Sequence, residues 1–290
     1  MRLAAIIIAI FETVLASSEA AAITPYSSSP FRQLIAIATV PARNDVPLYF
    51  SIRTGTLGSG KTQGVASEDG FYYQASGAVK INTAGQITTL FPGDGMFMPA
   101  GTRFALKADG AGQSPTYLQF LLASAPGSEP AQPIGTSVEV YRSPSPLPGL
   151  LPGSNLLTLN RVAVPPESPC DPLHQRSGVA LHYILAGVGA EFTVTRARAR
   201  PPGSVSYEPH GLVYQWSNPG SKPLIYLVFN INPKGVPPVV DPDDYDAFLA
   251  NSHVTWAIYC IALSLVLTVL VFATTSVDHD QKTDDRPRKR

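Results

Sequence analysis

The chain has 290 residues, of which 44% are hydrophobic and only 14% are charged, so it can form hydrophobic cores and is not disordered throughout. Its 28 prolines and 23 glycines are typical of short segments joined by turns and predict an all-β protein. Lysine plus arginine equals aspartate plus glutamate at 21 each, so charge does not favour nucleic acid, and we expect no nucleic-acid partner.

Residues 1–22 have the pattern of a secretory signal peptide. Arg2 precedes an apolar run over residues 3–11, and small residues close the segment at Ala20, Ala21 and Ala22. An uncleaved membrane anchor would need a longer apolar run. The pattern therefore predicts that the folded part of the chain is exported.

The middle of the chain contains an internal repeat at an offset of 110 residues. At this offset Gly93 recurs as Gly203, Pro99 as Pro209, and Gly101 as Gly211. The same offset aligns residues 72–77 with residues 182–187. Short β-rich runs surround these blocks, at residues 78–81, 116–122, 179–185, 191–195 and 224–231. Such self-similarity predicts two small antiparallel barrels in tandem.

The turn-rich stretches between these blocks indicate the domain boundaries. We expect a first barrel over residues 32–125 and a second over residues 155–235. Residues 126–154 are dense in proline, serine and glycine and are expected to link the barrels. Residues 236–253 form a second linker of this kind, between the second barrel and the next segment.

Residues 254–277 contain no charged side chain and predict a transmembrane helix. A helix of this length spans roughly 36 Å, and Trp256 and Tyr259 lie where an interfacial aromatic belt is expected. The tail, residues 278–290, carries five lysines and arginines, which the positive-inside rule keeps in the cytoplasm. We therefore expect a single-pass type I membrane protein with extracytoplasmic barrels.

The repeated glycines and proline resemble the second motif of the cupin family. In the second half, Gly203, Pro209 and Gly211 follow its spacing, and Tyr214 replaces its histidine. The upstream blocks that end at Gly77 and Gly187 resemble the end of the first cupin motif. The resemblance covers roughly residues 45–235 and implies a bicupin, with two double-stranded β-helix barrels in one chain. The glycines also suit tight turns, which require positive φ.

The resemblance implies metal-ligand positions, but most of them hold other residues. Metal-dependent cupins bind a divalent metal through two histidines and a glutamate of the first motif and a histidine of the second. These positions hold Gly64, Ala66, Gly70 and Phe104 in the first half, and His174, Arg176, Ala180 and Tyr214 in the second. Since Arg176 repels cations and one imidazole cannot hold a metal, we expect degenerate metal sites and no cofactor.

Two interpretations of the second barrel remain open. In the first, His174, Arg176, His182 and Tyr214 line a pocket for a small anionic or aromatic ligand, because a buried arginine needs an anionic partner. The alternative for Arg176 is an orientation toward solvent at the mouth of the barrel. In the second, His174, His182 and Tyr214 converge on a divalent transition metal.

The first interpretation predicts a small-ligand-binding or structural bicupin, and it is preferred. The second predicts an enzyme, either a dioxygenase-like oxidoreductase or a decarboxylase acting on a small organic acid or a phenolic compound. No catalytic residue is assigned in either case. A homo-oligomer is compatible with both interpretations.

Arg196, Arg198 and Arg200 alternate with alanines, which places three cations on one face of a strand. A solvated edge that resists aggregation is favoured over an anion site. His210, between Pro209 and Gly211, is expected in a turn that faces solvent.

Overall fold

The structure, a computed structural model, describes residues 30–41, 47–110, 114–124, 136–147 and 154–240. The predicted signal peptide (1–22), transmembrane helix (254–277) and tail (278–290) lie outside these residues, as do parts of both predicted linkers. No helix in the described ranges is long and apolar enough to span a membrane. All the regular structure described is β-strand, which confirms the all-β prediction.

The first barrel consists of two antiparallel sheets. The larger has the order β10-β2-β9-β4-β7 and the smaller β3-β8-β5-β6. The strands of the larger sheet are β10 (Thr136–Arg142), β2 (Tyr49–Thr56), β9 (Thr116–Ala123), β4 (Asp69–Ser76) and β7 (Gly95–Met98). Those of the smaller are β3 (Thr62–Val65), β8 (Arg103–Ala108), β5 (Val79–Thr83) and β6 (Gln86–Leu90).

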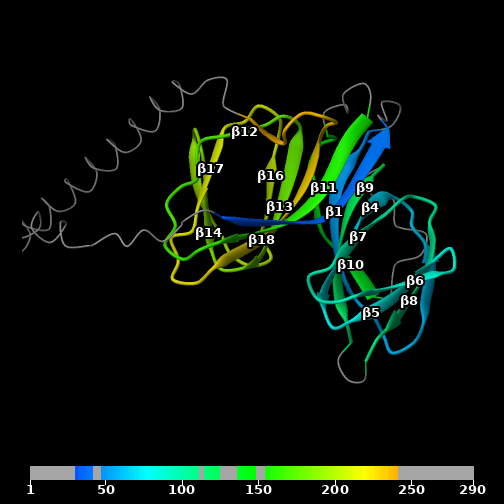
Figure 1. The fold of residues 1–290 in the computed structure, drawn as a ribbon. Helices are drawn as coiled ribbons and strands as arrows, with labels where there is room; N and C mark the ends of the chain where they lie inside the picture. The colour runs from blue at the N-terminus through cyan, green and yellow to red at the C-terminus, as the bar shows by residue number, and fades with distance from the viewer. Residues whose placement is uncertain (1–29, 42–46, 111–113, 125–135, 148–153, 241–290) are drawn as a thin grey trace, which may run out of the picture.

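The second barrel has the same plan, with a larger sheet β1-β11-β18-β13-β16 and a smaller sheet β15-β14-β17. The larger contains β1 (Phe31–Pro41), β11 (Ser154–Val164), β18 (Leu224–Pro233), β13 (Val179–Ala186) and β16 (Val205–Glu208). The smaller contains β15 (Arg196–Arg200), β14 (Gly189–Thr193) and β17 (Tyr214–Ser217), and β12 (Gln175–Arg176) pairs separately with β19 (Val239–Val240). Figure 1 shows the two barrels side by side.

The strand pairing shows the internal repeat directly. Gly64 pairs with Phe104 in the first barrel, and His174 pairs with Tyr214 at the positions 110 residues later. The motif glycines Gly93 and Gly203 both have positive φ, at 99° and 81°, as the turns require. The tandem repeat predicted from the sequence is thus confirmed as two copies of one strand arrangement.

Two strands pair in ways that the expected barrel boundaries do not anticipate. β1 precedes the first barrel but pairs with β11 of the second along its whole length (Figure 1). β10, which falls in the expected linker 126–154, pairs with β2 of the first. The boundaries expected from composition therefore differ from the observed pairing. The alternation of side chains along a strand determines which face of the strand is buried. Long-range backbone hydrogen bonding determines which sheet edge the strand covers.

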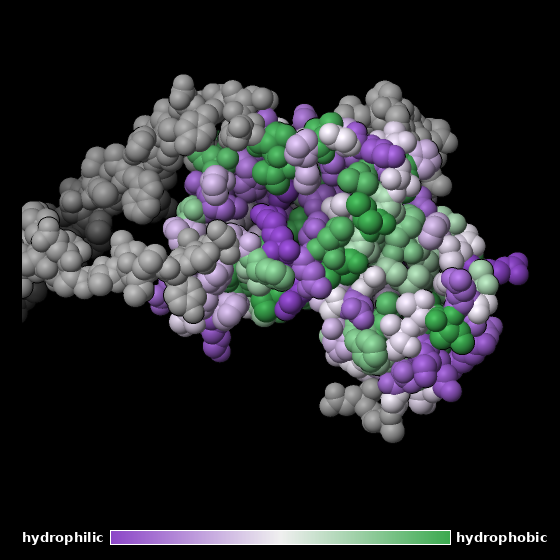
Figure 2. All heavy atoms as spheres, viewed as in Figure 1, coloured by the Kyte–Doolittle hydropathy of each residue, from purple (hydrophilic) through white to green (hydrophobic). Residues whose placement is uncertain are grey.

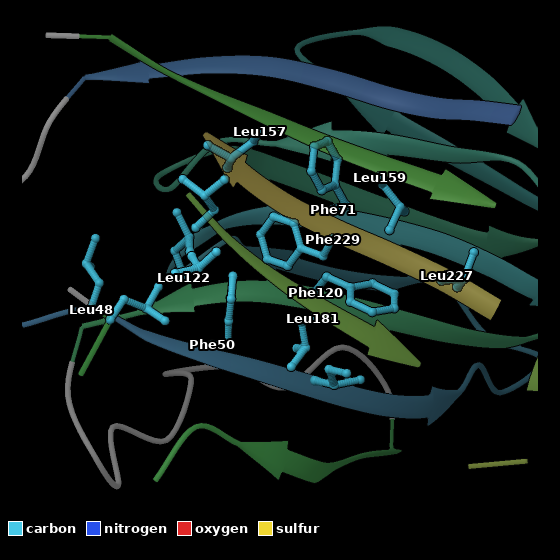
Figure 3. Close-up of a cluster of buried hydrophobic side chains, with 14 of the residues drawn as sticks. Leu48, Phe50, Phe71, Phe120, Leu122, Leu157, Leu159, Leu181, Leu227 and Phe229 are labelled. Carbon is cyan, nitrogen blue, oxygen red and sulfur yellow. The ribbon is translucent and has the colours of Figure 1, made fainter. Parts of the chain in front are cut away.

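The two larger sheets pack face to face and share one apolar core. Phe229 of the second barrel contacts Phe50, Phe71 and Phe120 of the first, with ring centroids 5.0, 5.5 and 6.1 Å apart (Figure 3). Phe229, Phe50 and Phe120 are completely buried. The barrels are therefore held together by side chains that neither barrel buries alone.

The exchanged strand β1 leaves part of its apolar surface exposed. Phe31, Leu34 and Ile37 are each more than half exposed. On the face seen in Figure 2, apolar side chains gather where the two barrels meet. β1 thus connects the barrels and also contributes apolar surface outside the shared core.

Candidate functional site

A buried cluster of charged and polar side chains lies inside the second barrel. Glu208, at the end of β16, is completely buried, and Arg176 on β12 is only 3% exposed. Arg176 Nε donates to Glu208 Oε2 at 2.5 Å, and Trp216 Nε1 donates to Glu208 Oε1 at 2.8 Å. Arg176 Nη1 also lies 3.4 Å from Asn230 Oδ1. Both oxygens of the carboxylate therefore have partners from within the chain.

His182 completes this cluster from strand β13. Its Nε2 lies 3.0 Å from Arg176 Nη2 and 3.4 Å from Glu208 Oε2. Because a guanidinium only donates, the imidazole accepts at Nε2, and its proton lies on Nδ1. The ring lies 5.1 Å from both Trp216 and Tyr226, measured between centroids. Within the described residues, Nδ1 has no hydrogen-bond partner.

Strand alternation explains why these side chains face inward. On β13, Ala180 and Ile184 belong to the apolar cluster inside the second barrel, whereas Leu181 belongs to the core between the barrels. His182 shares the inward face of Ala180 and Ile184 because successive side chains alternate. The β13–β16 register pairs Ala180 with Glu208, which brings the carboxylate to the same end of the barrel.

The cluster shifts the pKa values of both titratable members. Burial by itself would raise the pKa of Glu208, but the positive charge of Arg176, together with the contributions of His182 and His174, holds that pKa well below its usual value. Burial lowers the pKa of His182, and the opposing effect of Glu208 does not cancel it. We therefore describe Glu208 as ionised and His182 as neutral near pH 7.

No protein-family profile matches this chain, and no curated protein matches its sequence. Solved structures do match. An oxalate decarboxylase structure has 16% identity and a TM-score of 0.48, and covers 69% of this chain and 76% of its own. A Bacillus subtilis oxalate decarboxylase variant has 16% identity, the same coverage and a TM-score of 0.47. AerE from Microcystis aeruginosa has 13% identity and a TM-score of 0.47, covering 69% of this chain and 99% of its own.

The described strands form two barrels of one arrangement in tandem. The similarities to solved structures do not indicate which ligand or reaction this chain has.

The two barrels differ sharply at equivalent interior positions. His182 and Tyr226 stack at 5.1 Å and 19° in the second barrel, and Tyr72 and Tyr117 stack at 5.1 Å and 21° in the first. Three members of the polar cluster have apolar counterparts 110 residues earlier: Ala66 for Arg176, Met98 for Glu208 and Leu106 for Trp216. The same geometry thus encloses an uncharged interior in the first barrel, where Gln74 is the buried polar partner of the Tyr72 hydroxyl, and a charged interior in the second.

The structure brings together only part of the predicted pocket. Arg176 and His182 are in contact, as described above. His174 Nδ1 instead lies 3.0 Å from Pro172 O, and the Tyr214 hydroxyl donates to Tyr207 O at 3.0 Å. The backbones of His174 and Tyr214 exchange hydrogen bonds, from His174 N to Tyr214 O at 3.1 Å and from Tyr214 N to His174 O at 2.8 Å. Among the described residues, however, no side-chain hydrogen bond joins His174, His182 and Tyr214 to one another.

Sequence reasoning missed Glu208, the residue on which the cluster is centred. The glutamate directly precedes Pro209 of the repeated motif, where the sequence predicts only a solvent-facing turn at His210. His210 is indeed exposed, with its Nδ1 3.0 Å from Arg176 O. The repeat contained a signal that Glu208 faces the interior, because it aligns this residue with the apolar Met98, which is buried in the first barrel.

The residues of the second barrel do not fit a metal ion. Among the described residues, no group of three or more histidines, cysteines, aspartates and glutamates is placed to hold one. The imidazole and carboxylate closest to each other, those of His182 and Glu208, both face the guanidinium of Arg176. A divalent cation between them would be repelled by that fixed positive charge.

The stability of this chain is expected to fall as the pH decreases below about 6.5. The folded pKa of His182 lies below its unfolded value, so the unfolded chain binds more protons in this interval. The charges that face His182 are Glu208 on β16, Arg176 on β12 and Glu191 on β14. Urea titrations at several pH values should give a slope of up to about 1.4 kcal/mol per pH unit from this one group.

The control for this prediction is the His182→Gln variant, which cannot titrate in the same interval. It should show a flatter dependence of the free energy of unfolding on pH. Equal slopes for the variant and the parent chain would contradict a neutral, buried His182.

Proposed function

We propose that this chain is a membrane-anchored, extracytoplasmic bicupin that binds a small ligand through its second barrel without a metal cofactor. The observation that carries this proposal is the position of Arg176. Its guanidinium brings a positive charge into the barrel and is held there by Glu208, His182 and Asn230. A carboxylate, an imidazole and an amide oxygen are groups that bind metals, but here they bind a side-chain cation.

Ligand binding is favoured over a purely structural role because of the contrast between the barrels. A buried ion pair often stabilises a fold no more than well-packed apolar residues do. The first barrel demonstrates such packing, with Ala66, Tyr72 and Met98 at the positions of Arg176, His182 and Glu208. The charged interior is therefore unnecessary for this fold, and clustered charges with shifted pKa values are typical of functional sites.

The cellular placement in this proposal rests on the ends of the sequence. Residues 1–22 predict export, and residues 254–277 followed by a basic tail predict an anchor whose C-terminus is cytoplasmic. Both segments lie outside the described residues. In this arrangement the barrels face the extracytoplasmic side and are tethered through residues 236–253.

Elemental analysis of the full chain, purified in detergent without a metal-affinity tag, tests the proposal. We expect substoichiometric transition metal, and we expect chelator treatment to leave the free energy of unfolding unchanged. The matched variant is His174→Ala, which removes the single histidine retained from the family's ligand set. Near-stoichiometric metal in the parent chain that is lost in His174→Ala would overturn the proposal and favour the metal-dependent enzyme.

A further inference from the structure

A second polar feature of the second barrel lies outside the Glu208 cluster. A cavity of ≈ 320 Å³ opens beside strand β15. Its lining includes Arg196, Arg198 and Arg200, together with Thr193, Thr195 and Tyr214. Arg196, Arg198 and Arg200, which we call the arginine ladder, thus line a concave site.

The three arginines share one face of β15 because they alternate with alanines. Residues two apart on a strand are separated by roughly 7 Å, so the ladder presents cations at regular intervals. Arg200 is used within the barrel: its Nε donates to Glu191 Oε2 at 2.6 Å. Arg196 and Arg198 are exposed and extend the same face toward the cavity.

The charges of Arg196 and Arg198 are not compensated within the described part of the chain. Glu191 is the acidic residue of the lining, and both of its oxygens are occupied, one by Arg200 and the other by the Ser206 hydroxyl. Neither Arg196 nor Arg198 forms an ion pair with another described residue. The cavity therefore carries two guanidinium groups that have no ion-pair partner among the described residues.

The first barrel argues against a simple charged edge that prevents aggregation. Its equivalent strand is β6, which is also the last strand of its sheet. The positions that correspond to Arg196, Arg198 and Arg200 are Gln86, Thr88 and Leu90, none of which is charged. The edge strand in the same place of the first barrel thus has no arginines. Protection of a sheet edge against aggregation therefore does not explain the arginines of β15.

We infer that this cavity binds a small organic dianion, whose two anionic groups are held by Arg196 and Arg198. This inference rests on the proposed ligand-binding function and assigns it a site. Guanidinium groups bind carboxylate and phosphate oxygens in pairs, and two of them favour a ligand with two negative charges over one with a single charge. The threonine hydroxyls supply further hydrogen-bonding groups at the wall, and a cavity of this volume suits a small molecule.

Isothermal titration calorimetry on the full chain in detergent tests this inference with three probes. Glutarate and inorganic phosphate are dianions, and acetate carries a single carboxylate. We expect both dianions to bind more tightly than acetate, with affinity that falls as salt concentration rises. The double variant Arg196→Gln/Arg198→Gln should bind the dianions roughly tenfold to a hundredfold more weakly.

The matched control is Arg103→Gln, which removes an exposed strand arginine from the first barrel. It should bind the dianions as the parent chain does. If the parent chain binds neither dianion, or if the double variant binds them equally well, the site is refuted.

These outcomes are independent of the metal analysis. A chain with little metal that fails to bind dianions would reject this site but retain the metal-independent second barrel. Near-stoichiometric metal together with dianion binding would retain this site but reject the metal-independent second barrel.

Discussion

Replacing Arg176 with alanine is expected to lower the free energy of unfolding by about 3–5 kcal/mol. The substitution leaves the carboxylate of Glu208 completely buried without its ion-pair partner, and it leaves His182 Nε2 without its donor. Urea denaturation followed by far-ultraviolet circular dichroism measures the change. Arg103→Ala, at an exposed strand position, is the control and should change stability by less than about 0.5 kcal/mol.

A double variant tests whether the loss comes from the unpaired charge. Arg176→Ala/Glu208→Met introduces the residues of the first barrel, Ala66 and Met98, at the equivalent positions. It should be less destabilised than the sum of the two single variants, with a coupling of about 1–3 kcal/mol. The double variant does not recover the full stability of the parent chain, because Trp216 Nε1 loses its acceptor whenever Glu208 is replaced. Additive effects would mean that Arg176 and Glu208 do not stabilise one another.

Replacing Phe229 with alanine is expected to cost about 3–5 kcal/mol, and to affect both barrels. Its ring is completely buried and contacts three phenylalanines of the first barrel, so truncation leaves a cavity in the shared core. Hydrogen exchange should show lower protection in the larger sheets of both barrels, because their packing is shared.

The control for this prediction is Phe91→Ala, since Phe91 is 59% exposed. It should leave both the free energy of unfolding and the exchange pattern close to those of the parent chain. A loss of protection confined to the second barrel would show instead that the two barrels unfold independently.

The polar cluster and the cationic cavity belong to the same barrel but have different chemistry. In the cluster, Arg176 is only 3% exposed and its charge is balanced by Glu208, so it is closed to solvent. At the cavity, Arg196 and Arg198 are exposed and their charges are unbalanced among the described residues. Glu191 lines the cavity and contributes to the electrostatics of His182, so it connects the two regions.

The sequence by itself determined the strand class, the tandem repeat and the positions that face each barrel. These are local properties: strands alternate with a period of two residues, and turns such as those at Gly93 and Gly203 need positive φ. The cupin resemblance and the strand alternation also indicated Arg176 and His182 as candidates for interior positions, with a solvent-facing Arg176 as the alternative.

Only the tertiary structure decided the partners of those residues. Glu208 is 32 residues from Arg176 in sequence, and it reaches the guanidinium because β13 pairs with β16 in one particular register. Likewise, β1 and β10 join the barrels to which their sequence positions did not assign them. Whether the arginines of β15 faced open solvent or a cavity also depended on the packing around that strand. Local periodicity determines the direction of a side chain, but long-range pairing determines what it meets there.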